Sequence, residues 1–267
     1  MAIAVACTHL FVASPIDAVE FRLPRAPPFE GDLAPNQRLT KAELLLEDQV
    51  YGPESIAINR NTGKVYTGLK TGLICEIDII RLTSLDGCDG SYHSMVKCGR
   101  PLGLRIHPKT DELFVLDAYL GLFSINWKTE LALFSTSFRY LNDFDFLPDG
   151  CLVISESSTK FDDRDFIYDL LEHRPNGRML AYNPVTDEIS VLLDGLYFPN
   201  GIQVVRGKVL IAEMGKARVL SGNAIWVPIA AIRSDSDNWL AARPTVRSLL
   251  TKVRQHPHCD QSLPSFW

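Results

Sequence analysis

Oxygen-bearing side chains stand at the start of three short runs that alternate apolar and polar residues: Glu54, Asn142 and Asn200. A carboxylate and two amide carbonyls are hard donors of the kind that calcium takes, usually six to eight oxygens at about 2.3–2.6 Å. The three side chains could share one ion if their runs converge on a common axis. Taken singly, Glu54 is more simply a solvated charge, and Asn200 with Gly201 is ordinary turn chemistry.

Sets of residues for nucleophilic or acid–base catalysis are not recognisable in the sequence. His107 precedes Pro108 at the end of a strand-like run, where a structural role is the simpler interpretation. No Ser-His-Asp or Cys-His set can be assembled, so no catalytic residue is assigned. None of the six cysteines belongs to a Cys-x-x-Cys pair, which argues against a zinc site.

The elements that would position the three oxygen donors are copies of one unit: a strand, a polar turn and a returning strand. The most complete copy is 141–157, with its turn at Pro148-Asp149-Gly150. Superposed copies are spaced by 48, 40 and 58 residues and begin at Glu54, Leu102, Asn142 and Asn200. A period in the forties, filled by short strands and turns, is typical of a β-propeller blade. The sequence therefore predicts an all-β fold.

Length and composition are consistent with one large domain, since the chain has 267 residues and 46% hydrophobic content. Its net charge is −5, and no run of lysine and arginine is interleaved with aromatic residues. Nucleic acid is therefore not expected as a partner. A small molecule or a protein is the expected ligand.

The first two parts of the chain are an arm and a set of blades. Residues 1–38 begin with an apolar segment, Met1–Ser14, which is shorter than the roughly 20 residues of a membrane span. The rest of 1–38 is rich in proline and is expected as an extended arm on the surface. Residues 39–220 hold the blades, and the third strands of the first three blades each begin with glycine, at Gly72, Gly121 and Gly177.

A helical insertion is predicted within the third blade, between residues 157 and 176. Asp162 or Asp163 can begin the helix. Its apolar side is expected to consist of Phe166, Ile167, Leu170 and Leu171. An insertion at this point is expected to lie over one mouth of the propeller, although it could equally be a packing helix.

The last part, residues 221–267, breaks the repeat. Ser221–Ile229 resembles the second strand of a later blade whose first strand is absent. Trp239–Val253 is basic and amphipathic and is predicted to be helical on both sides of Pro244.

The cysteines leave the redox compartment open. Cys88 and Cys98 bracket the loop between the first and second blades, so either a disulfide closes the loop in an oxidising lumen or two thiols stay free in the cytosol. Cys75 and Cys151 lie within strand-like runs and are expected to be buried as apolar side chains.

Seven motifs in sequence order resemble the strictosidine synthase-like family. They are Gly52–Ala57, Cys98–Leu104, Leu116–Phe123, Leu141–Asp143, Gly177–Leu180, Val191–Asp194 and Phe198–Gly201. The resemblance runs from about Ser14 to Val219 and resumes from about Gly222 to Val253. It implies a six-bladed β-propeller, here incomplete, with about four blades and a partial one. A segment between Val219 and Ser221 and the whole sixth blade have no counterpart in the sequence.

The resemblance also implies which residues form a site. Glu54, Asn142 and Asn200 match three ligands of a calcium ion that the broader superfamily holds in the central channel. Asp143 is a weaker candidate, for a second and structural ion. A fourth ligand, an aspartate, falls in the missing segment, and its loss should weaken calcium binding.

For function, the resemblance implies a calcium-dependent hydrolase of aryl esters or lactones, in which the ion acts as a Lewis acid. It further implies a propeller on the lumenal or extracellular side, often tethered to a membrane. The glutamate of strictosidine synthesis belongs to the missing sixth blade, so that activity is not expected. The alternative function is a non-catalytic propeller beside a membrane, which binds a protein or lipid partner at its exposed blade edges.

The same family commonly has a disulfide at the positions of Cys88 and Cys98, and the resemblance therefore implies this bond. Arg105, Asp117 and Tyr119 belong to matched motifs. For these three residues, a role in holding blades together through buried polar pairs is as good an interpretation as a role in the site.

Overall fold

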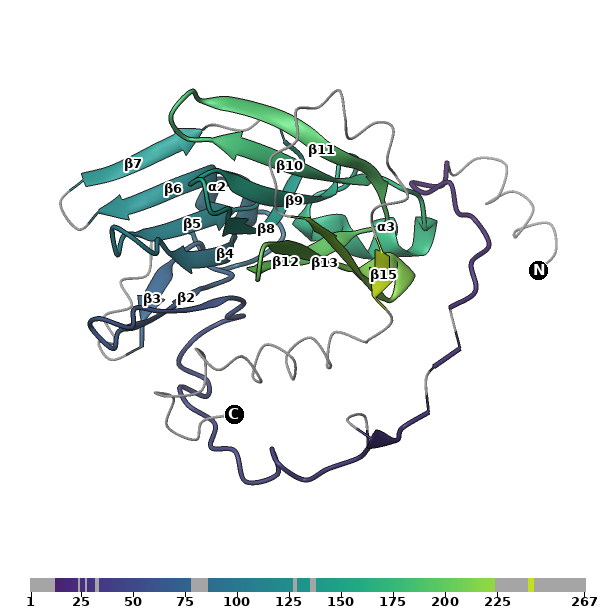
Figure 1. Ribbon diagram of the computed structural model, residues 1–267, viewed down its shortest axis with the longest axis horizontal. Helices are drawn as coiled ribbons and strands as arrows, with labels where there is room; N and C mark the ends of the chain where they lie inside the picture. Colours follow the sequence, from purple (N-terminus) through teal and green to yellow (C-terminus); the bar gives the residue numbers. More distant parts are fainter. Residues whose placement is uncertain are drawn as a thin grey trace.

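The computed structural model describes residues 13–23, 25–26, 28–31, 34–77, 86–126, 129–134, 138–223 and 240–242. These residues form four antiparallel sheets and a few short helices, so the all-β prediction is confirmed. Each sheet takes its strands in chain order (Figure 1).

The strands of the first sheet are β1 (Ile56–Ile58), β2 (Val65–Gly68) and β3 (Ile74–Glu76). Those of the second sheet are β4 (Pro101–Ile106), β5 (Leu113–Asp117), β6 (Gly121–Asn126) and β7 (Thr129–Phe134). Those of the third are β8 (Tyr140–Phe146), β9 (Leu152–Ser158), β10 (Gly177–Asn183) and β11 (Glu188–Leu196). Those of the fourth are β12 (Pro199–Val205), β13 (Lys208–Glu213), β14 (Arg218–Asn223) and β15 (Leu240–Ala242). The helices are α2 (Met95–Cys98), η2 (Asp163–Asp165), α3 (Phe166–Glu172) and η3 (Met214–Lys216).

The first two strands of every sheet form the predicted hairpin. In the third sheet, Phe144 of β8 pairs with Ile154 of β9, and both side chains are fully buried. Directly paired residues of antiparallel strands project to the same face, so this pair contributes to one core. The turn between the strands has Gly150 at φ 93°, a left-handed conformation that glycine adopts without steric cost.

Hydrophobic clusters lie between successive sheets and hold them face to face. Between the first and second sheets the cluster contains Ala57, Tyr66, Leu104, Leu113 and Val115. Between the second and third it contains Phe114, Leu116, Leu122, Leu141, Phe144, Leu152, Ile154, Leu180 and Tyr182. Between the third and fourth it contains Leu147, Cys151, Val153, Met179, Leu196, Ile202, Val209, Ile211 and Leu220. Each large apolar side chain buried there stabilises the fold by about 1.5–3 kcal/mol.

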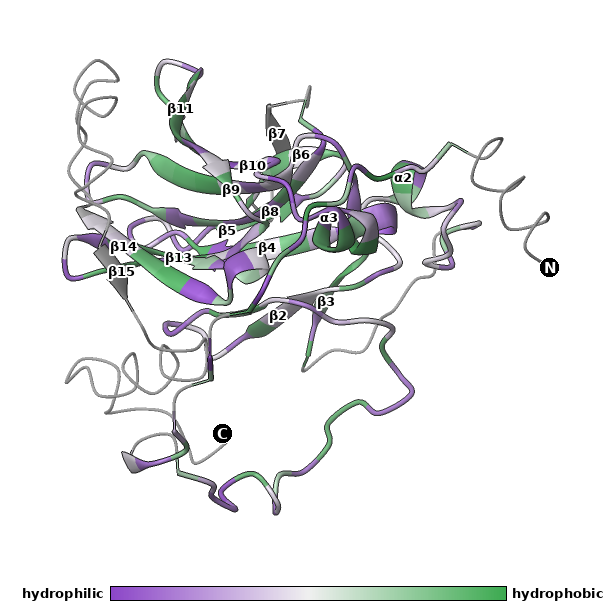
Figure 2. Ribbon diagram, turned by 90° about the vertical axis from the view of Figure 1, so that its right-hand side faces the viewer, coloured by the Kyte–Doolittle hydropathy of each residue, from purple (hydrophilic) through white to green (hydrophobic). Residues whose placement is uncertain are grey.

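The first strands of the sheets contact one another in succession: β1 contacts β4, β4 contacts β8, and β8 contacts β12. Figure 1 shows the last strands of the second and third sheets, β7 and β11, farther out. Hydrophobic residues follow the strands, whereas many connecting turns are hydrophilic (Figure 2). Sheets of sequential strands that stack in this order are typical of neighbouring blades of a β-propeller.

The insertion between β9 and β10 is helical, as predicted. The side chain of Asp162 caps it by accepting a hydrogen bond from the backbone amide two residues on, at 3.0 Å. Phe166 and Leu170 pack against the beginnings of β4, β8 and β12. Ile167 and Leu171 are 49% and 59% exposed, so the predicted apolar side is only half correct. Residues one position apart are rotated by about 100° around a helix, and this short helix buries a narrow stripe.

The disulfide between Cys88 and Cys98 is confirmed, with 5.6 Å between the two Cα atoms. It closes the loop between the first and second sheets. A Cβ atom on Gly72 would lie only 1.9 Å from the carbonyl oxygen of Cys98, so the first sheet can approach this loop only with glycine there. The free thiols of Cys75 and Cys151 are buried, as predicted.

The described part of the N-terminal arm has no strand, and after its first residues it loops away from the sheets (Figure 1). It is fastened to the end of α3. The backbone amide of Val19 donates a hydrogen bond to the carbonyl oxygen of Glu172 at 3.0 Å. The ring of Phe21 stacks on the ring of His173, with 3.6 Å between ring centroids.

The C-terminal part differs from the prediction. Leu240–Ala242, predicted to be helical, form strand β15 on the edge of β14. The unpaired backbone groups of that edge favour a further strand. Ser221–Asn223 continue β14 instead of starting a later blade, because they pair with β13. Residues 1–12, 224–239 and 243–267, which carry the rest of these predictions, lie outside the described residues.

Candidate functional site

The first strands of the sheets begin at one end of the molecule, which we call the entrance face. Glu54, before β1, contacts Arg100, before β4. The ring of Tyr140, at the start of β8, lies 5.7 Å from that of Phe198, just before β12. These contacts join the first sheet to the second and the third to the fourth, and Leu102 of β4 packs against Tyr140 and Phe198 and so links the two pairs.

β-Bulges recur where three of the first strands leave the entrance face. In β8, Leu141 pairs with Glu156 and Phe144 with Ile154, which leaves two residues, 142 and 143, opposite the single residue 155. Equivalent shifts in β4 and β12 each add one residue, near positions 102 and 200. A bulge re-aims side chains and is common beside active sites. The bulged positions in β8 and β12 carry the predicted ligands Asn142 and Asn200.

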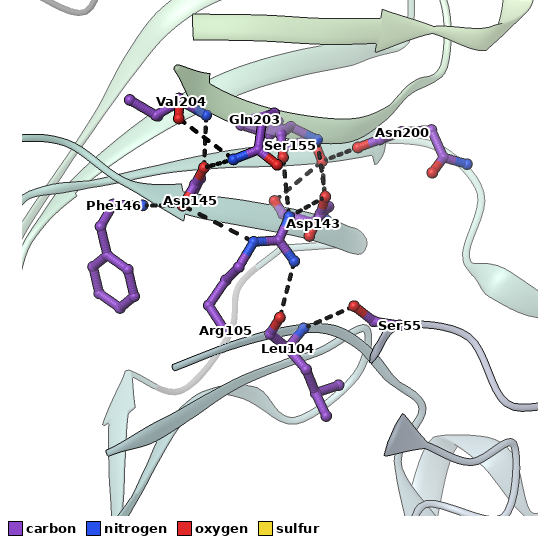
Figure 3. Close-up of polar contacts among 11 residues, drawn as sticks. Ser55, Leu104, Arg105, Asp143, Asp145, Phe146, Ser155, Asn200, Gln203 and Val204 are labelled. Carbon is purple, nitrogen blue, oxygen red and sulfur yellow. Dashed lines mark hydrogen bonds and ion pairs between the residues drawn. The ribbon is translucent and has the colours of Figure 1, made fainter. Parts of the chain in front are cut away.

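Asn142 is 5% exposed, and no hydrogen bond joins its amide to another described residue. The amide atoms of Asn142 are not among the fully buried unpaired atoms of the described chain, so water or a ligand can reach them. The Asn200 amide likewise has no partner among the residues that the structure describes. Its backbone carbonyl oxygen accepts a hydrogen bond from Oγ of Ser155 at 2.6 Å, and Figure 3 shows its side chain turned away from Arg105.

Glu54 lies on the first sheet and is paired with a cation of the protein itself. Its Oε2 is 3.4 Å from Nη2 of Arg100, and its side chain is 46% exposed. Arg100 is buried and also donates from Nη1 to the carbonyl oxygen of Gly52 at 2.8 Å. Its Nε lies 3.8 Å from Oδ2 of Asp163 and makes no hydrogen bond within the described chain.

Tyr140 and Asp163 complete this polar group. The Tyr140 hydroxyl donates a hydrogen bond to Oδ1 of Asp163 at 2.7 Å. Burial, followed by the charges of Asp163 and more weakly of Glu54, raises the pKa of Tyr140 well above its ordinary value. The phenol therefore keeps its proton at neutral pH and acts as a donor that orients Asp163.

Asp143, the weaker predicted ligand, faces an arginine. Its Oδ2 accepts hydrogen bonds from Nη2 of Arg105 at 3.0 Å and from the backbone amide of Ile202 at 2.9 Å (Figure 3). Its Oδ1 is buried without a hydrogen-bond partner within the described chain. Burial raises the pKa of this carboxyl, and Arg105 and the Ile202 amide oppose that effect. A guanidinium thus engages one oxygen of Asp143, and the role of that carboxylate at a second ion stays a prediction.

The predicted donors fit calcium by type, but only one of them is charged. Among the described residues, no group of three or more His, Cys, Asp or Glu side chains is gathered in a way that could hold a metal ion. A site at the entrance face would therefore use one carboxylate, from Glu54, and the two unpartnered amides. His107 is structural, as predicted, because its Nδ1 accepts from the backbone amide of Thr110 at 3.1 Å.

Several residues of the entrance face were not predicted. Ser155 is one of three serines of β9, and only the pairing of the strands shows that it lies opposite the bulge of β8. Arg100 was quoted only within a motif, although a basic residue directly before a first strand could have been paired with Glu54. Asp163 is one of the two residues that the sequence offers as the helix cap, and the structure shows that the cap is Asp162. The predicted role of Arg105 in buried polar pairs is confirmed.

Comparison with known proteins places these features in context. The family model for strictosidine synthase matches residues 142–223, and that for the strictosidine synthase-like N-terminal region matches residues 31–77. The adipocyte plasma membrane-associated protein of Bos taurus is 33% identical, over 90% of this chain and 69% of that protein. The Salmo salar protein of that name is 38% identical over the same shares. The Arabidopsis thaliana protein strictosidine synthase-like 13 is 25% identical over 93% of this chain and 79% of its own length. Within the described chain, no helix has the length and hydropathy needed to cross a membrane.

Proposed function

Because the chain belongs to the strictosidine synthase-like family, among the adipocyte plasma membrane-associated proteins, we propose that it is a calcium-dependent hydrolase of aryl esters or lactones. Glu54, Asn142 and Asn200 would hold the ion, and water or substrate oxygens would complete its shell. When bound, calcium supplies Lewis-acid polarisation of the substrate carbonyl. The fold of the family implies six blades, of which this chain would carry four and part of another.

The observation that carries this proposal is the pair of amides on bulges. Asn142 and Asn200 occupy equivalent bulged positions on neighbouring sheets, and neither amide has a described hydrogen-bond partner. Structural asparagines of strands and turns normally bond to the backbone near them. Two such amides at one face, with Glu54 at the equivalent place on the first sheet, support a shared oxygen ligand set.

Arg100 makes the proposed site a weak one. Its guanidinium, 3.4 Å from Glu54, competes with an incoming cation for the only carboxylate of the set. Glu54 would therefore have to turn from Arg100 toward the ion, which its half-exposed side chain permits. Ligand charge tunes calcium affinity, and we propose a dissociation constant of roughly 0.1–1 mM, as in extracellular modules.

Thermal unfolding and ester hydrolysis test the proposal together. Calcium at tenfold its dissociation constant should stabilise the protein by about 1.4 kcal/mol, since an ion that binds only the folded state shifts the equilibrium. The chain should hydrolyse phenyl acetate, and EDTA should abolish this turnover. Glu54→Gln should remove both effects.

The matched control is Glu188→Gln, which alters an exposed glutamate on the outer strand β11. This variant should keep the calcium response and the hydrolysis of the unaltered protein, and magnesium should not replace calcium. If calcium leaves the unfolding temperature unchanged, or if Glu54→Gln responds like the unaltered protein, the proposed site is wrong.

A second candidate function is favoured by one uncovered sheet face. Ala57 of β1 packs toward the second sheet, whereas its neighbours Ile56 and Ile58 project from the opposite face and are 49% and 39% exposed. Such a face suits an apolar protein surface as a partner. This function would be favoured if the folded protein does not hydrolyse esters and the double change Ile56→Lys with Ile58→Lys removes partner binding. Ile189→Lys, on β11, is the control and should leave partner binding intact.

Membrane association is proposed from the name of the relatives, adipocyte plasma membrane-associated protein. We propose that the sheets lie on the lumenal or extracellular side, where the bond between Cys88 and Cys98 stays oxidised. Protease protection of the sheets in sealed vesicles tests this orientation. Digestion of intact vesicles from the cytosolic side would contradict it.

A further inference from the structure

A single guanidinium connects three of the sheets close to the entrance face. Arg105 of β4 donates from Nη2 to Oδ2 of Asp143 on β8 and to the carbonyl oxygen of Ile202 on β12, each at 3.0 Å. Its Nη1 donates to the carbonyl oxygen of Leu104 at 2.9 Å. Its Nε lies 3.9 Å from Oδ1 of Asp145. Figure 3 shows the guanidinium at the centre of these contacts.

The two carboxylates extend the connection into β12. Besides Arg105, Asp143 accepts from the backbone amide of Ile202 at 2.9 Å. Asp145 accepts from the backbone amide of Val204 at 2.6 Å and from the side-chain amide of Gln203 at 2.8 Å. The strand that carries Asn200 is therefore bound at successive residues to the strand that carries Asn142.

The hydrogen bonds end beside each predicted calcium ligand. Leu104, next to Arg105, donates its backbone amide to Oγ of Ser55, the residue after Glu54, at 3.3 Å. Asp143 directly follows Asn142 within the bulge of β8. Ile202 is two residues beyond Asn200 and follows the bulge of β12. One connected set of bonds thus reaches the backbone beside all three donors.

We infer that Arg105 is a positioning residue, which fixes the bulges of β8 and β12 so that the amides of Asn142 and Asn200 are presented together. The inference rests on the proposed calcium site for its ligand, but the bonds themselves are independent of it. A planar fork with several donors in fixed directions can satisfy acceptors on different sheets at once, which a lysine ammonium on a flexible stem cannot do. Residues that hold metal ligands in place typically affect affinity by 10–100-fold when they are altered.

The test compares Arg105→Met with Arg178→Met. Arg178 is a matched control, because it also pairs with a buried carboxylate: its Nε lies 2.6 Å from Oε2 of Glu156. Unlike the contacts of Arg105, this pair lies within one sheet, the third. Calcium affinity is measured by isothermal titration calorimetry on the full chain. Arg105→Met should weaken binding about tenfold or more, Arg105→Lys should recover only part of that loss, and Arg178→Met should stay within about twofold of the unaltered protein.

Hydrogen exchange on the same proteins, without calcium, judges the positioning role separately. Arg105→Met should accelerate exchange in both 140–146 and 199–205, whereas Arg178→Met should do so in β9 and β10. An unaltered protein that does not bind calcium would refute the proposed function, and the exchange data would still decide the role of Arg105. Unchanged exchange in 199–205, or calcium binding by a folded Arg105→Met variant equal to that of Arg178→Met, would overturn the inference.

Discussion

Oγ of Ser155 donates a hydrogen bond of 2.6 Å to the carbonyl oxygen of Asn200, which lies on the neighbouring sheet. Oγ of Ser155 also accepts a hydrogen bond, from the backbone amide of Asp143 at 3.0 Å. Ser155 is fully buried and stands opposite the bulge of β8. One hydroxyl therefore joins the bulge that carries Asn142 to the bulge that carries Asn200.

Ser155→Ala should destabilise the fold and weaken calcium binding. The change removes the partner of a buried carbonyl and a buried amide, which costs about 1–3 kcal/mol of unfolding free energy. Because both groups adjoin proposed ligands, we also expect about tenfold weaker calcium binding. Urea unfolding and calorimetric titration measure the two effects.

The control for this prediction is Ser157→Ala. Its hydroxyl is also fully buried and also donates at 2.6 Å to a carbonyl of β12, that of Pro199. The control should lose stability as well, but Ser157 has no bond to the bulge of β8 and contacts only the residue before Asn200, so its calcium binding should weaken less than that of Ser155→Ala. Equal calcium affinities in the two variants would show that Ser155 contributes to packing alone.

The sequence predicted the hairpins and the order of the sheets because both depend on local patterns. Phe144 and Phe146 alternate with polar residues, and turns such as Pro148-Asp149-Gly150 have characteristic residues. The bulges were not predictable, since an extra residue in one strand appears only when its partner is paired with it. Strand β15 was missed for a similar reason: Leu240–Ala242 has no strand pattern of its own and is selected by the free edge of β14.

The glycines that begin third strands were noted in the sequence, but their role depends on the neighbouring sheet. A Cβ atom at Gly177 would lie 2.2 Å from Cδ of Pro199 and 2.8 Å from the carbonyl oxygen of Ser157. Gly177 thus lets the third sheet approach the start of β12. No single-sequence pattern shows which glycine meets a later strand.

Gly177→Ala should therefore lower stability by about 1–3 kcal/mol, because the added methyl forces the third and fourth sheets apart. Gly201→Ala is the control, since the nearest atom to its Cβ, an oxygen of Asp143, is 3.8 Å away. Thermal unfolding of the two variants compares them directly. Equal unfolding temperatures would contradict the close packing at Gly177.

Removal of the disulfide should loosen the start of β4. The double change Cys88→Ala with Cys98→Ala should lower the free energy of unfolding by about 2–3 kcal/mol, since the bond closes a short loop of sequence separation 10. A reducing agent should destabilise the unaltered protein by a similar amount and leave the double variant unchanged. The prediction fails if reduction shifts both proteins equally, because the bond between Cys88 and Cys98 would then not be the one whose loss lowers the stability.

Docking of the N-terminal arm should depend on pH through His173. Its ring lies between Phe21 of the arm and Tyr197, at centroid distances of 3.6 and 4.8 Å, and its Nε2 is buried without a hydrogen-bond partner among the described residues. The ammonium of Lys216 lies 5.1 Å from the ring of Phe21 and 3.7 Å from that of Tyr197. A proton on His173 would thus be held next to a cation and inside an aromatic stack.

Burial, followed by the charge of Lys216, lowers the pKa of His173, and the carboxylate of Glu213 opposes this effect only in part. Above the ordinary histidine pKa of about 6.5, the ring is neutral whether the arm is docked or free, and docking does not change with pH. Below that value the free form takes up the proton first, so docking weakens as the pH falls. Acidification should therefore release the arm.

Hydrogen exchange at the Val19 amide, which bonds to the carbonyl oxygen of Glu172, measures this release. After correction for the intrinsic effect of pH on exchange, protection should fall as the pH is lowered from about 6.5 to 5. His173→Asn is the control, because asparagine tolerates the left-handed backbone at φ 52° and does not titrate. Its arm should dock more weakly, but equally so at both pH values. If protection in the variant falls over the same pH range, a group other than the imidazole of His173 controls docking.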